Sequence, residues 1–73
     1  MEITYNSNTD LLYIRFDSRL QEIRNERITE DIVLDRGDNN RIVGTEILDA
    51  SEKISLEGLR PSKFRIIEEG AIA

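Results

Sequence analysis

Glu46 is the residue whose setting in this 73-residue chain most suggests chemistry. It interrupts the apolar run IVGTEIL, and a carboxyl group held against apolar surface has a raised pKa that suits a general acid. Arg15, at the end of the run LLYIR, can supply an opposite charge, and Tyr13 precedes it on the same face of an extended segment. We therefore take Arg15, Glu46 and Tyr13 as candidate binding residues. The interpretation that we prefer for Glu46 itself is a structural ion pair, with Arg15 or with an arginine of a second subunit.

The residue types that the chain lacks argue against most catalytic and metal-binding classes. There is no cysteine and no histidine, which removes disulfides, thiolate nucleophiles and the common transition-metal ligands. No glycine-rich phosphate loop, activated serine or second catalytic carboxylate accompanies Glu46. The twelve positions from Asp35 to Glu46 match the length of a calcium-binding EF-hand loop but not its ligand pattern. We therefore predict no catalytic residue, no metal and no cofactor, and the sequence favours a non-enzymatic protein.

The charge of the chain limits its partners. Fifteen acidic and ten basic residues give a formal net charge of −5, and the acids are spread along the chain. Tyr13 and Arg15 on one face resemble a small stacking platform, but an acidic surface repels phosphate backbones, so we predict no nucleic-acid binding. No apolar run approaches the roughly 20 residues of a membrane span, and no signal peptide is evident. We expect a soluble cytoplasmic protein, with a small basic protein as one possible partner.

Two hairpins are predicted from alternating apolar residues around turn-forming clusters. In the first, within residues 1–17, EITY and LLYIRFD flank NSNTD. In the second, residues 32–48, the strands flank RGDNN, and Asn40 is the residue expected to adopt a left-handed conformation. In this register Leu34 faces Gly44, and the glycine leaves room for a bulky neighbour.

The segment 18–31 permits two interpretations. Ser18 and Gln21 resemble a helical capping box, and Leu20 and Ile23 have helical spacing. The apolar stripe does not continue, however, and a charged strand near residues 21–28 fits the edge of a sheet equally well. We prefer an edge strand followed by a turn.

A short helix is predicted over residues 50–57. Asp49 is the expected N-cap with Glu52 as its reciprocal partner, and Gly58 is the expected stop before Pro61. The tail, residues 60–73, either adds a short strand around Phe64 and Ile66 or docks loosely. The prediction is a single α+β domain over 1–73: a small antiparallel β-meander of four to five strands followed by one short helix.

The predicted sheet has apolar residues on both faces. They are Ile32, Leu34, Ile42 and Leu48 on one face of the second hairpin, and Val33, Val43 and Ile47 on the other. A sheet in a monomer usually has one polar, solvated face, and a domain of this size has little chain with which to cover a second apolar one. We therefore predict a homodimer.

The segments YNSNTDLLYIRF and IVLDRGDNNRIVGTEILDAS resemble a family of small prokaryotic proteins known as domain-of-unknown-function family 2283 (DUF2283). This sequence departs from the family's Asp-x-Asp-Gly turn at Gly37 and Asn40, which argues against a cation-binding turn. The resemblance implies an antiparallel sheet with a following helix and implies no activity, although some members are thought to be partners of small toxin-like proteins. Our leading prediction is a protein-interaction module, antitoxin-like toward a small basic protein. The alternative is a small hydrolase or ligand-binding protein with a site at the homodimer interface that uses Glu46 and Arg15.

Overall fold

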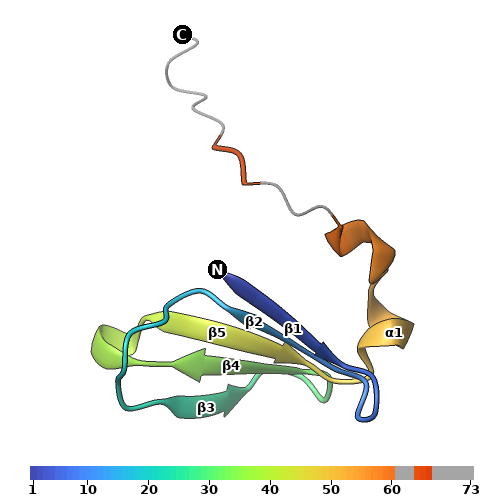
Figure 1. Ribbon diagram of the computed structural model, residues 1–73. Coiled ribbons are helices and arrows are strands. Elements are labelled where there is room, and N and C mark those ends of the chain that lie inside the picture. Colours follow the sequence, from blue (N-terminus) through green and yellow to red (C-terminus); the bar gives the residue numbers. More distant parts are fainter. Residues whose placement is uncertain (61–63, 67–73) are drawn as a thin grey trace, which may run out of the picture.

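The computed structural model describes residues 1–60 and 64–66. Five strands form one antiparallel sheet, and a short helix and a 3-10 turn follow, which confirms the predicted α+β class (Figure 1). The elements are β1 (Glu2–Asn6), β2 (Leu11–Arg15), β3 (Arg24–Arg27), β4 (Ile32–Arg36), η1 (Asp38–Asn40), β5 (Ile42–Ile47), α1 (Ala50–Lys53) and η2 (Glu57–Leu59).

The strands lie in the order β1-β2-β5-β4-β3, so the sheet is not filled in chain order. Because β5 and β4 separate β2 from β3, the connection 16–23 passes their ends to reach the far edge. Its start is fixed by the amides of Phe16 and Asp17, which donate to the carbonyl of Val43 at 2.7 and 3.1 Å. Later, the side-chain oxygen of Gln21 accepts a bond of 2.8 Å from the Asp38 amide. The strand interpretation of segment 18–31 is confirmed by β3, an exposed edge strand.

The predicted register of the second hairpin is correct beside the turn and wrong further along. Arg36 pairs with Ile42, but a β-bulge follows, and Asp35 instead of Leu34 lies opposite Gly44. In the turn itself Asn40 is left-handed as predicted, with φ 60°, and Asn39 is left-handed too, with φ 59°. A one-residue shift moves every later side chain to the opposite face relative to its partner strand, and no local sequence pattern marks the bulge.

This shift corrects the predicted distribution of apolar residues, which placed Ile47 on the face opposite Ile32 and Leu34. Ile32 and Leu34 lie on the same face as Ile47, because they pair with Ile47 and Thr45. We call this side the apolar face; its two central rows across the strands are Tyr5, Leu12, Ile47 and Ile32, then Ile3, Ile14, Thr45, Leu34 and, at the β3 edge, Glu26. The opposite side, which we call the polar face, carries the rows Thr4, Tyr13, Glu46, Val33 and Arg27, then Glu2, Arg15, Gly44, Asp35 and Asn25.

The helix is shorter than predicted, and its cap comes from elsewhere. Asp49 has a left-handed backbone and makes no side-chain cap bond, and α1 ends at Lys53 because Ile54 is extended. Asp10, in the β1–β2 turn, caps α1 instead: its carboxylate accepts bonds from the amide and hydroxyl of Ser51 at 3.0 and 2.7 Å. The Tyr5 hydroxyl and then Ser51 hold the pKa of Asp10 below its ordinary value. Gly58 lies within η2 and does not end the helix.

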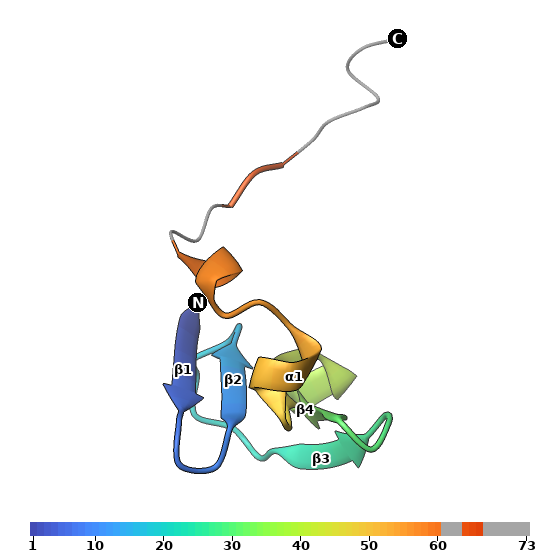
Figure 2. The ribbon, with the colours of Figure 1, turned by 90° about the vertical axis from the view of Figure 1, so that its right-hand side faces the viewer.

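Few side chains are fully buried in the described part of the chain. The fully buried hydrophobic residues are Leu12, Val43 and Ala50. The extensive contacts between elements are all between neighbouring strands. Viewed from the end of the sheet, α1 and the segment after it lie on one side of the strands (Figure 2).

The predicted tail strand falls partly outside the described residues, since 61–63 and 67–73 are not among them. Residues 64–66 form no strand, and Phe64 and Ile66 are exposed. Among the described helices, none has the length and apolar character needed to cross a membrane.

Candidate functional site

The three candidate residues lie together on the polar face, on the neighbouring strands β2 and β5. Tyr13 in β2 pairs directly with Glu46 in β5. Arg15 lies two residues along β2 from Tyr13, opposite Gly44. The pairing of β2 with β5 therefore brings together residues from the two hairpins. Their side chains share one face because side chains alternate between the two faces along each strand.

Asp35, which the sequence analysis did not select, is the centre of the cluster. The Tyr13 hydroxyl donates to one of its oxygens at 3.0 Å, and the Asn25 amide donates to the other at 2.5 Å. Asp35 is only 6% exposed, although acids at strand ends are usually solvated. Asp35 lies opposite Gly44 because of the bulge, which the sequence does not reveal. The one local indication of its burial is that it alternates with Val33 along an apolar strand.

Gly44 allows Tyr13 to reach Asp35 across β5. A Cβ atom at Gly44 would lie 2.6 Å from the Tyr13 hydroxyl and 2.8 Å from the carbonyl oxygen of Ile14. The aromatic side chain therefore occupies the space that a side chain at position 44 would fill. The prediction that this glycine accommodates a bulky neighbour is confirmed, but the neighbour is Tyr13.

The electrostatics of the cluster are dominated by burial and by the paired acids. Burial raises the pKa of Glu46, and the charge of Asp35 and a hydrogen bond with it raise that pKa further, while the charge of Arg27 opposes the rise. Burial also raises the pKa of Tyr13, and the hydrogen bond to Asp35 adds to this. Within the described residues, no ion pair joins Arg15 to Glu46, and the buried Nε of Arg15 has no hydrogen-bond partner.

The cluster has proton-transfer groups but no enclosed place for a substrate. The raised pKa of Glu46 favours its protonated form, and this carboxyl group lies beside that of Asp35. Two open cavities in the described part of the chain are not lined by these acids, although Arg15 lines one of them. The described residues also contain no group of three or more side chains suited to hold a metal ion. The geometry is that of a hydrogen-bonded network that ties β2, β4 and β3 together.

Replacing Glu46 with glutamine is expected to stabilise the protein at pH 8 and to have little effect near pH 4. The pKa of Glu46 in the folded protein is raised above its ordinary value of 4.5. The contribution of Glu46 to folding stability is therefore fully present below pH 4.5 and is lost as the pH rises through the folded pKa. We expect a gain of about 0.5 kcal/mol at pH 8, the size of a relieved cross-strand like-charge contact. Urea unfolding at both pH values measures it.

The exposed acid Glu22 provides the control for this substitution, because Glu22→Gln changes the net charge by the same amount. It should leave the difference between the two pH values unchanged. An equal gain in both variants would show that net charge, and not the contact with Asp35, causes the effect.

Comparison with known proteins gives one match. A family model described as "Protein of unknown function (DUF2283)" matches residues 2–51. The matched segment contains all five strands and the polar network, and it ends within α1. Neither the search of curated proteins nor the search of solved structures returned a significant match.

Proposed function

The chain belongs to the DUF2283 family of proteins of unknown function, and from this premise we propose that it is a cytoplasmic, non-enzymatic protein-interaction module that acts as a homodimer. The observation that carries the proposal is the incomplete cover of the apolar face. Each protomer would contribute this face to the dimer, in a twofold-symmetric arrangement.

The centre of the apolar face supports this arrangement. Ile14, Thr45 and Leu34 lie side by side across β2, β5 and β4, and each is only partly buried. In the adjacent row Leu12 is fully buried, whereas Ile47 and Ile32 are not. Contiguous apolar surface of this kind is uncommon on monomers and is typical of interaction sites. Covering it with a second copy removes it from water at both protomers at once.

Two variants of β4 test the dimer, and each places a positive charge on a different face of the sheet. We expect Leu34→Lys to shift the protein from dimer to monomer, because a buried, unpaired ammonium group at the seam is strongly unfavourable. Val33 is the matched control, since it is also half-buried and adjacent to Leu34 but lies on the polar face. Val33→Lys should remain a dimer. Sedimentation equilibrium at micromolar concentration measures the mass, and circular dichroism checks that both variants fold.

Two results would contradict the homodimer. A wild-type protein that is monomeric at high micromolar concentration would remove it altogether. Dissociation of both variants, with both still folded, would show that the apolar face is not the specific seam.

A small basic protein is the second partner that we propose for the module. Its support is the charge at the α1 end of the sheet, where backbone bonds bring residues 10, 31 and 48–50 close together. Acidic residues predominate there: Asp10, Glu30, Asp31, Asp49 and Glu52. Lys53 lies 3.4 Å from Asp31 and offsets one of these charges. Such a surface attracts basic partners and repels acidic ones.

Recovery of a stoichiometric basic protein from the native host would support the antitoxin-like role. We expect its association rate to fall steeply with added salt and to fall also in the double variant Asp49→Lys, Glu52→Lys. Failure to recover any stoichiometric partner would count against this role and leave the homodimer untouched.

The hydrolase or ligand-binding alternative has less support from the geometry. It requires Glu46 and Arg15 to lie at the dimer seam, but both are on the polar face, whereas the seam that we propose is on the apolar face. The carboxylate of Asp35 is also satisfied by Tyr13 and Asn25 without a ligand, whereas the buried Nε of Arg15 is not.

A further inference from the structure

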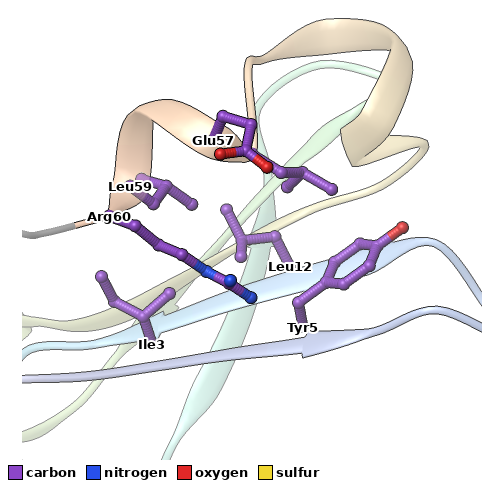
Figure 3. A pocket seen from close by; sticks show the side chains of 7 residues that line it. Ile3, Tyr5, Leu12, Glu57, Leu59 and Arg60 are labelled. Atoms are coloured by element: carbon purple, nitrogen blue, oxygen red, sulfur yellow. The ribbon is translucent and has the colours of Figure 1, made fainter.

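A cavity of about 600 Å³ opens between the apolar face and the segment that follows α1 (Figure 3). Ile3, Tyr5 and Leu12 line it from β1 and β2. Residues around η2 line the other side, namely Leu56, Glu57, Leu59 and Arg60. The volume lies within the range of small-molecule sites, which is roughly 300–1,000 Å³.

The lining combines apolar walls with one inward-pointing cation. Ile3, Leu12 and Leu59 surround the side chain of Arg60, which extends into the cavity with its guanidinium directed toward Tyr5 (Figure 3). No ion pair involves Arg60 within the part of the chain that the structure describes. Glu57, on the same turn, places a carboxylate on the opposite side of the opening. Arg60 is exposed, so its stem lies along the aliphatic walls while its guanidinium remains accessible to an anion at the mouth of the cavity.

We infer that this cavity binds a medium-chain fatty acid, a monocarboxylate with an unbranched apolar body. Arg60 would take the carboxylate in the two-bond geometry that guanidinium groups favour. The aliphatic chain would lie against Ile3, Leu12 and Leu59, and each buried methylene contributes roughly fourfold in affinity.

The charges of the lining distinguish this class from others. A phosphate or other dianion would meet one cation and the nearby carboxylate of Glu57, which disfavours it. An apolar amine could pair with Glu57, but its ammonium group would be repelled by Arg60. A neutral hydrocarbon would leave the guanidinium without an anionic partner.

The site belongs to this chain and not to the family pattern as a whole. Ile3, Tyr5 and Leu12 lie within the matched residues 2–51, whereas Leu56 to Arg60 lie beyond them. The cavity therefore exists only where the segment after α1 folds over β1 and β2. The cavity lies on the same apolar face as the seam proposed for the dimer, but at its β1–β2 edge, and Leu34 does not line it.

The experiment titrates the full-length protein with sodium octanoate and follows backbone amide shifts by NMR and the melting temperature. We expect saturable binding, shifts centred on residues 3–12 and 56–60, and a rise in melting temperature by mass action. Acetate has the head group without the chain, and octylamine has the chain with the opposite charge. Both should bind at least about tenfold more weakly than octanoate.

Three variants separate the role of Arg60 from non-specific binding. Arg60→Met should weaken octanoate binding about tenfold or more, the value of a charged hydrogen bond. Arg41→Met removes an equal charge from an exposed residue outside the cavity and should leave binding unchanged. Glu57→Gln should strengthen it, because the opposing carboxylate is gone.

The inference is overturned by any of three results. These are no saturable octanoate binding up to about 10 mM, equal binding of octanoate and octylamine, or unchanged binding in Arg60→Met. The C-terminal residue of a peptide carries the same carboxylate on a shorter apolar side chain, so N-acetyl-leucine is the remaining probe. Tighter binding of N-acetyl-leucine than of octanoate would also overturn the assignment to a fatty acid.

Discussion

Replacing Leu12 with alanine is expected to lower the free energy of unfolding by about 3 kcal/mol, the usual cost of truncating a fully buried leucine. Leu12 has no exposed surface, and it lies between Tyr5 and Ile47 in one row of the apolar face. A chain of this length has a total stability of about 4–11 kcal/mol, so the loss is a large fraction of it. The melting temperature should fall by roughly 15 °C.

Leu20 offers the matched control for this experiment. The same substitution there removes a side chain that is 102% exposed, and surface changes of this kind stay within about 0.5 kcal/mol. Thermal and urea unfolding of both variants test the difference. Similar losses in both would mean that Leu12 does not belong to the core, and the assignment of the apolar face would then be wrong.

Gly44→Ala is expected to destabilise the protein by about 2 kcal/mol, since an added methyl group in a tightly packed site forces its neighbours to move. The new atom would lie 2.6 Å from the Tyr13 hydroxyl and 2.8 Å from the Ile14 carbonyl oxygen. The aromatic ring can move, but the backbone carbonyl of the paired strand can move only with β2. Movement of the ring also breaks the 3.0 Å bond to Asp35.

Gly58→Ala is the control, because a Cβ atom there would meet nothing closer than 3.8 Å. That substitution should be neutral or slightly stabilising.

A double-mutant cycle with Tyr13→Phe identifies the cause. If the alanine acts partly by displacing the hydroxyl from Asp35, it should cost about 0.5–1 kcal/mol less in the phenylalanine background. Strict additivity would show that the clash with the Ile14 carbonyl oxygen accounts for the whole effect.

The polar network and the apolar face differ in how far the sequence could predict them. Tyr13, Arg15 and Glu46 were selected because polar residues inside apolar runs are unusual, and that signal is local. Asp35 and Asn25 were missed because their contacts depend on which residues lie opposite each other in the strand pairs β3–β4 and β4–β5. No residue next to Asp35 in the sequence indicates that Tyr13, 22 positions earlier, donates to it.

The sequence by itself determined the antiparallel sheet, both hairpins and the left-handed Asn40, since alternation and turn chemistry act over a few neighbouring residues. The tertiary structure decided which side chains share a face, because one bulge in β5 shifts the register and the shift is set by pairing between strands. It also decided the length of α1, whose first turn is held by Asp10 from a distant turn and not by the adjacent Asp49. Contacts between residues far apart in the chain depend on the assembled sheet, and local patterns in the sequence do not encode them.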